Sequence, residues 1–132
     1  MNKGTMLEGK VAVITGSGRG IGRDIALQMA AQGAKVVVND IGASVSGEGN
    51  DASPGQQVVD EIKAGGGQAA LSTDSVSEWT SANRIVQCAL DSFGRIDIVV
   101  NNAGILRDRM FFAMSVDEWK AVIDVHLNGC FY

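Results

Sequence analysis

Cysteine is scarce in this sequence, and its spacing excludes the common metal and redox motifs. The two residues, Cys88 and Cys130, lie far apart, and neither belongs to a C-x-x-C or C-x-x-H pattern. Structural zinc sites and redox-active dithiols need such clustered ligands. We therefore predict free thiols, a reducing compartment and no metal site.

Long apolar runs and an excess of positive charge are also absent. No stretch approaches the ~20 apolar residues that span a bilayer, and the first segment, MNKGTMLEGK, lacks the hydrophobic core of a signal peptide. There are 11 lysine and arginine residues against 15 aspartate and glutamate residues, so the net charge is -4. This balance disfavours phosphate backbones and anionic membranes as partners. We therefore expect a cytoplasmic protein that binds neither nucleic acid nor membrane.

The 132 residues, 45% of them hydrophobic, are enough for one buried core and contain no repeat or linker. Apolar runs of strand length alternate with apolar residues at helical spacing. The expected strands are residues 11–14, 36–38, 69–71 and 96–100, and the expected helices follow from residues 21, 54, 77 and 115. The continuous apolar character of 96–100 predicts cover on both faces of that strand. This alternation is typical of the α/β class, and we predict a doubly wound parallel sheet of about four strands.

A glycine-rich turn joins the first expected strand to the first expected helix. It reads Thr15-Gly16-Ser17-Gly18-Arg19-Gly20-Ile21-Gly22. Glycines at this position allow a tight turn and let a pyrophosphate approach the helix N-terminus, where unpaired N–H groups and the helix dipole favour negative charge. The turn therefore predicts a dinucleotide site. The alternative is a tight strand-to-helix turn without a ligand.

Asp40 ends the second expected strand, about 20 residues beyond the turn, where a dinucleotide fold places an acid on the adenosine ribose. Its carboxylate can accept hydrogen bonds from both ribose hydroxyls. A 2'-phosphate would instead bring like charge to within a few ångströms. Arg19 favours the opposite choice, because a guanidinium can pair with a 2'-phosphate. We expect NAD in preference to NADP.

Two motifs together resemble those of the short-chain dehydrogenase/reductase family. They are Thr15-Gly16-x-x-x-Gly20-Ile21-Gly22 in the first turn and Asn101-Asn102-Ala103-Gly104 after the fourth expected strand. The resemblance extends from Lys10 to the last residue. It implies a Rossmann-type fold, a nicotinamide cofactor and hydride transfer to or from a carbonyl or alcohol carbon.

The same resemblance implies roles for particular residues. Ile21 would approach the pyrophosphate, Asp74 and Ser75 would flank the adenine, and Asn102 would lie beside the cofactor. All of these residues are expected at the carboxyl ends of the strands, where ligands of such sheets bind. The expected cofactor-binding residues are Gly16, Ser17, Arg19, Gly20, Ile21, Gly22, Asp40, Asp74, Ser75, Asn102, Ala103 and Gly104.

Members of this family carry a catalytic tetrad of asparagine, serine, tyrosine and lysine, the last two spaced as Tyr-x-x-x-Lys. The only tyrosine is Tyr132, the final residue, so we expect residues 1–132 to be a dinucleotide-binding half-domain that lacks the catalytic half and is inactive alone. The asparagine position falls on His126. Asn128 lies two residues later, a turn of ~200° around a helix. His126 is thus the candidate at the catalytic asparagine position, and the alternative is a core histidine.

The long loop after Asp40 and the run from Asn102 to Arg109 are similar to the 3-hydroxyacyl-CoA dehydrogenase domain of multifunctional enzyme type 2 and its bacterial relatives. The segment Ile105-Leu106-Arg107-Asp108 is also similar to 3-oxoacyl-carrier-protein reductases. The resemblance therefore implies an acyl thioester as the small-molecule substrate, and a homo-oligomer, dimer or tetramer, of the full-length enzyme. Three alternatives stay open: an NADP-dependent 3-oxoacyl-carrier-protein reductase, a non-catalytic NAD-binding module, and an α/β domain without a dinucleotide.

Overall fold

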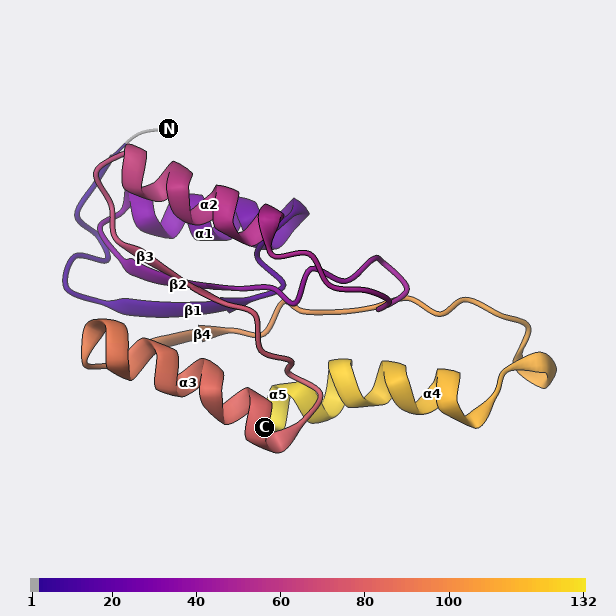
Figure 1. Ribbon diagram of the computed structural model, residues 1–132. Coiled ribbons are helices and arrows are strands. Elements are labelled where there is room, and N and C mark those ends of the chain that lie inside the picture. The colour runs from indigo at the N-terminus through magenta and orange to yellow at the C-terminus, as the bar shows by residue number, and fades with distance from the viewer. Residues whose placement is uncertain (1–2) are drawn as a thin grey trace.

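A four-stranded parallel sheet forms the centre of the molecule (Figure 1). The strands are β1 (Val11–Thr15), β2 (Lys35–Asn39), β3 (Ala69–Ser72) and β4 (Ile98–Val100), in the order β3-β2-β1-β4. The computed structural model describes residues 3–132, so the first two residues of the segment considered above for a signal peptide lie outside it. The predicted α/β class and its doubly wound, Rossmann-type parallel sheet are confirmed.

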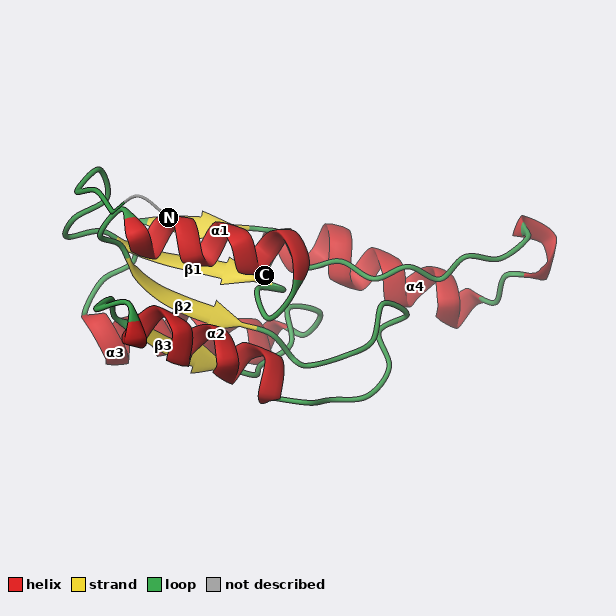
Figure 2. Cartoon of the chain, turned by 90° about the horizontal axis from the view of Figure 1, so that it is seen from above, coloured by secondary structure: helices red, strands yellow, loops and turns green. Residues whose placement is uncertain are grey.

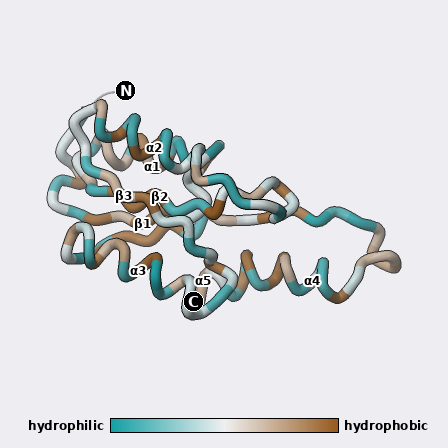
Figure 3. The backbone as a smooth tube through the Cα atoms, viewed as in Figure 1, coloured by the Kyte–Doolittle hydropathy of each residue, from teal (hydrophilic) through white to brown (hydrophobic). Residues whose placement is uncertain are grey.

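Helices cover both faces of the sheet because the strands carry apolar side chains on both sides. Helices α1 (Gly20–Ala31) and α2 (Ser53–Ala64) lie on one face, and α3 (Trp79–Phe93) lies on the other (Figure 1). Along the tube in Figure 3 the strands are mostly hydrophobic, whereas the helices alternate between hydrophobic and hydrophilic residues. All five residues of β1 are buried. Strand β1 is therefore covered on both faces of the sheet.

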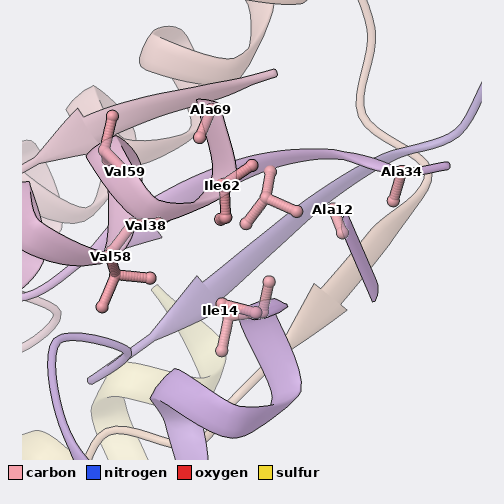
Figure 4. Packing of buried hydrophobic residues seen from close by; sticks show 10 residues of the cluster. Ala12, Ile14, Ala34, Val38, Val58, Val59, Ile62 and Ala69 are labelled. Carbon is pink, nitrogen blue, oxygen red and sulfur yellow. The ribbon is translucent and has the colours of Figure 1, made fainter. Parts of the chain in front are cut away.

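Two clusters of buried side chains hold these layers together. The cluster between the sheet and α1 and α2 is shown in Figure 4 and consists of Ala12, Ile14, Ala26, Ala34, Val36, Val38, Val58, Val59, Ile62 and Ala69. The cluster on the α3 face consists of Val11, Val13, Val37, Val76, Ile85 and Ala89. Successive strand residues alternate between the two clusters, as the period of a strand requires. Burial of a valine or isoleucine side chain stabilises the fold by about 1.5–3 kcal/mol.

The fourth strand differs from its prediction. It is shorter than expected and lies at the edge of the sheet, where β1 is its neighbour. Val99 points to the same face as Val13 yet is 53% exposed. The reason is the position of α3, which packs on β1, β2 and β3. The expected cover on both faces of residues 96–100 is therefore wrong for the outer part of this strand.

The last helix is divided into three parts. Helix α4 (Val116–Ile123) is followed by a π-helical turn, η2 (Asp124–Asn128), and by α5 (Gly129–Phe131). A capping box closes its start, since the side-chain oxygens of Ser115 and Glu118 each accept a hydrogen bond from the other residue's backbone N–H. Together with the short 3₁₀ helix η1 (Phe111–Ala113), α4 extends away from the sheet (Figure 2). No helix within residues 3–132 is both long and apolar enough to cross a membrane.

Candidate functional site

A cleft of about 530 Å³ lies at the carboxyl ends of the strands, where polar residues follow each apolar run. Ligand pockets commonly have volumes of 300–1,000 Å³. The cleft is bordered by the glycine turn, the loops after β2, β3 and β4, and the end of α4. Nine of the predicted cofactor-binding residues line it: Gly16, Arg19, Gly20, Asp40, Asp74, Ser75, Asn102, Ala103 and Gly104. The topology thus brings together residues that are far apart in the sequence.

The glycine turn needs its glycines for backbone conformation and for close packing. Gly16 and Gly20 have φ angles of 65° and 56°, which disfavour other residues. A Cβ on Gly16 would lie 2.9 Å from the Cα of Ala103. Gly22 is buried, and a Cβ there would collide with the carbonyl oxygen of Gly16. Gly22 therefore supports the packing of α1 on the turn and does not border the cleft.

The N-terminus of α1 lies beside this cleft without a side-chain cap. Arg19 is the N-cap residue, its side chain makes no capping hydrogen bond, and no acidic residue occupies the first helical turn. The first N–H groups of a helix have no partner within the helix and need one from outside. Together with the positive end of the helix dipole, such N–H groups form an anion-binding site.

Two of the predicted cofactor-binding residues in the glycine turn, Ser17 and Ile21, do not border the cleft. Ser17 is fully buried, with its hydroxyl donating to the carbonyl of Ile14 at 2.7 Å and its backbone N–H donating to Asn39. Ile21 is 74% exposed at the start of α1 and does not border the cleft. The structure therefore places Ser17 in the framework that holds the turn, and it does not bring Ile21 to the cleft wall.

Asp40 borders the cleft and also holds its walls. One carboxylate oxygen accepts from the N–H of Gly18 at 2.8 Å, and the other accepts from the N–H of Gly42 at 2.7 Å. Each oxygen of a carboxylate has two lone pairs, so both can accept a further hydrogen bond. The carboxylate thus fixes the glycine turn against the loop after β2 and keeps capacity for hydroxyl donors.

The segment after β3 is anchored by Asn39, which the sequence reading did not single out. Asn39 is 2% exposed, and its Nδ2 group donates to the carbonyl of Asp74 at 2.9 Å. Asp74 also forms an ion pair with Arg84, with 2.7 Å between Nε and Oδ1. The N–H of Ser75 donates to the hydroxyl of Ser81 at 2.7 Å. An amide that closes an apolar strand is the signal that would have indicated Asn39.

Asn102 and Thr15 join the end of β4 to the end of β1. The Asn102 Nδ2 group donates to the carbonyls of Thr15, at 3.0 Å, and Gly16, at 3.1 Å. The Thr15 hydroxyl accepts from the N–H groups of Asn102 and Ala103 and donates to the carbonyl of Val100. The amide of Asn102 is thus committed to the glycine turn. Thr15 belongs to the sequence motif, but its role in joining the two strand ends was not predicted.

His126 lies in the π-helical turn and contacts the loop after β4. Its Nε2 atom is 2.8 Å from the carbonyl oxygen of Ile105 and 3.1 Å from the N of the same residue. The ring also lies against Gly104, where a Cβ would come within 2.6 Å of Cε1. His126 is exposed and does not line the cleft, although its neighbours Asp124 and Val125 do. π-helical turns occur frequently at functional sites.

Comparison with known proteins agrees with this arrangement. A family profile described as short chain dehydrogenase matches residues 10–132. The chain is 48% identical to peroxisomal multifunctional enzyme type 2 of Drosophila melanogaster over 124 residues, which are 94% of this chain and 20% of that protein. It is also 48% identical to a hydroxyacyl-CoA dehydrogenase of Mycobacterium tuberculosis over 131 residues, which cover 96% of this chain and 38% of that protein.

A solved structure has the same fold. It is a short chain dehydrogenase from Mycobacterium avium, with a TM-score of 0.85 and 49% identity, over 95% of this chain and 45% of that one. The chain therefore spans between about a fifth and about half of the length of these three proteins. The match to the family profile covers nearly all of this chain, residues 10–132. By fold, motifs and sequence similarity, the chain belongs to the short-chain dehydrogenase family.

Proposed function

We propose that the cleft binds a nicotinamide dinucleotide, with NAD preferred over NADP. The observation that carries this proposal is the uncapped N-terminus of α1 beside the carboxylate of Asp40 in one cleft. The first suits a pyrophosphate and the second suits a ribose diol. The residues that would hold the dinucleotide are Gly16 and Gly20 at the pyrophosphate, Asp40 at the ribose, and Asp74 and Ser75 beside the adenine.

The preference for NAD rests on charge. A 2'-phosphate on the ribose would lie within a few ångströms of the Asp40 carboxylate, and like charges at that distance cost on the order of kilocalories per mole at a low effective dielectric. Arg19 also lines the cleft and carries the opposite charge. It supports a second candidate, an NADP-dependent 3-oxoacyl-carrier-protein reductase, because a guanidinium can pair with a 2'-phosphate.

The reaction we propose is oxidation or reduction of a hydroxy or keto group on an acyl thioester. We propose that a longer enzyme carries it out, and that residues 1–132 are the dinucleotide-binding half-domain of that enzyme. The nicotinamide supplies hydride acceptance or donation when it is bound. This chain's own residues bind and orient it. Asn102 keeps the glycine turn in place, and His126, at the tetrad asparagine position, fixes the backbone of Ile105.

Proton transfer is not assigned to any residue of this chain. Residues 1–132 contain no Tyr-x-x-x-Lys pattern, and we expect these residues alone to bind the dinucleotide without measurable turnover. A cytoplasmic location and a homo-oligomeric assembly of the longer enzyme are also parts of the proposal. The name of the Drosophila relative makes the peroxisome the alternative location. A non-catalytic NAD-binding module would bind the dinucleotide with the same residues and show no turnover in any longer form.

Titration calorimetry of this chain with NADH and with NADPH tests the proposal. We expect NADH to bind more tightly and Asp40→Ala to narrow the ratio of the two dissociation constants by on the order of tenfold, or ~1.4 kcal/mol. The ratio is the measured quantity because Asp40 also holds the glycine turn. Asp60→Ala, on the exposed side of α2, is the matched control. An unchanged ratio in Asp40→Ala would contradict the role of Asp40, and absence of binding to both dinucleotides would contradict the proposal as a whole.

A further inference from the structure

The loop between β2 and α2, residues 40–52, crosses to the segment that follows β4. The N–H of Leu106 donates to the carbonyl of Val45 at 2.8 Å, and the Nε–H of Arg107 donates to the carbonyl of Ser46 at 2.9 Å. The two segments run side by side in Figure 1. The bond between Arg107 and Ser46 joins residues that are 61 positions apart in the sequence. The contact is therefore tertiary and depends on the fold.

Both partners in this contact border the cleft. The loop contributes Ile41, Ala43 and Val45 to its wall, and the opposite segment contributes Ile105 and Arg107. Because the two segments are bonded to each other, this part of the wall is continuous. Separation of the loop from residues 105–107 would open it.

The loop has few other attachments. Within residues 3–132, two hydrogen bonds join residues 43–50 to the chain outside the loop, and their donors are Leu106 and Arg107. The loop also contains Gly42, Gly47 and Gly49, all at positive φ. Glycine-rich segments lose more conformational entropy on ordering than others, so each attachment affects how often such a loop opens.

Arg107 is the side chain that makes one of these two attachments. It is half-buried, whereas Arg109, two residues later, is exposed and forms an ion pair with Glu118 on α4, with 2.9 Å between Nε and Oε1. Arg109 does not line the cleft. The two arginines of this segment therefore have different surroundings. Arg109 carries the same charge as Arg107 but pairs with Glu118 and not with the loop, so it serves as the control position.

We infer that Arg107 is a positioning residue that holds the loop of residues 40–52 over the dinucleotide and thereby sets the rate of its release. This inference rests on the proposed function for the ligand, while the attachment itself is a property of the ligand-free chain. Loss of one hydrogen bond of ordinary net strength raises the equilibrium constant for opening of the loop by about fivefold. Because the attachment is present in the ligand-free chain and holds the loop over the bound dinucleotide, its loss makes opening easier in both states and accelerates entry and escape alike.

The experiment has two readouts on the wild type, Arg107→Met, Arg107→Lys and the control Arg109→Met. In the ligand-free chain, amide hydrogen exchange of Leu106 should become about fivefold faster in both Arg107 variants and stay unchanged in the control. In stopped-flow experiments, NADH dissociation and NADH association should both accelerate by about the same factor, so that the dissociation constant stays unchanged. Lysine retains the charge but lacks the Nε–H of arginine, so Arg107→Lys should behave like Arg107→Met.

Each contrary result would refute a different part of the inference. Unchanged exchange of the Leu106 amide in Arg107→Met would refute the attachment whether or not NADH binds. Faster exchange with an unchanged NADH dissociation rate would refute its effect on release. Restoration of the wild-type NADH dissociation rate by lysine while the Leu106 amide still exchanges faster, or a weaker salt dependence of association in Arg107→Met, would show that the charge acts on the phosphates instead. Failure of NADH to bind the wild type would refute the proposed function, and the exchange readout would still decide the attachment.

Discussion

Replacing Asn102 with alanine removes the side-chain link between the end of β4 and the glycine turn. Its Nδ2 group makes two hydrogen bonds, to the carbonyls of Thr15 and Gly16. Each such bond contributes about 1 kcal/mol net, so their loss should lower the free energy of unfolding by about 2 kcal/mol. Asn102 is half-buried, and water can reach the two carbonyls in the variant. We therefore do not add the full cost of leaving a buried acceptor unpaired.

Urea unfolding followed by far-UV circular dichroism measures this loss. With an m-value of about 2 kcal/mol/M, the midpoint of Asn102→Ala should fall by about 1 M relative to the wild type. Asn101→Ala is the matched control, because Asn101 precedes it in the same segment and is exposed. Surface substitutions of this kind usually change stability by less than about 0.5 kcal/mol.

A second substitution at the same position separates the hydrogen bonds from side-chain volume. Asn102→Asp keeps the shape but replaces two N–H donors with a carboxylate that faces two carbonyl oxygens. It should therefore be less stable than Asn102→Ala at neutral pH, since the carboxylate is repelled by both carbonyls. NADH affinity should fall in the same order. Equal urea midpoints for Asn102→Ala and Asn101→Ala, or an aspartate variant more stable than the alanine variant, would refute the reasoning.

Two further substitutions test the packing of the turn and the pH dependence of the fold. Gly22→Ala should abolish NADH binding in calorimetry while circular dichroism still shows a folded sheet, because the added Cβ would collide with the carbonyl of Gly16 and displace α1. Retained affinity would contradict this. The Arg95 guanidinium and the Val11 N–H hold the pKa of Asp97 below its ordinary value. Its carboxylate therefore stabilises the fold above the ordinary pKa, and this contribution is lost as the pH falls through the lowered pKa. Asp97→Asn should be less stable than the wild type at neutral pH, and the difference should shrink in urea unfolding as the pH falls below the ordinary aspartate pKa. A difference that does not change with pH would contradict the assignment.

The sequence predicts the elements that depend on local pattern. The apolar runs at β1 and β2, the glycine turn between β1 and α1, and Asp40 after β2 all lie where their spacing indicates. The capping box at Ser115 is equally local, since it needs only residues three positions apart. These features are short-range and have few alternatives, so a single sequence is enough to locate them.

Other features depend on tertiary packing, and the sequence does not contain their signal. The exposure of Val99 follows from where α3 packs, and the apolar character of residues 96–100 says nothing about that position. Ser17 is buried because its hydroxyl donates to the carbonyl of Ile14 and its backbone N–H donates to the carbonyl of Asn39, at the end of β2. The π-helical turn at residues 124–128 preserves the apolar spacing well enough to resemble a regular helix. Thr15 and Asn39 act through backbone groups on neighbouring strands, which only the sheet order brings into reach.

The bond between the Asn102 N–H and the Thr15 hydroxyl joins residues 87 positions apart. A ligand that contacts both the glycine turn and the segment after β4 therefore bridges the two ends of a chain loop of that length. Its binding free energy adds to the stability of the β1–β4 pairing, because only the folded chain presents both surfaces. A dinucleotide in this cleft would thus act as a noncovalent cross-link, closing the same large loop that a disulfide at these positions would close.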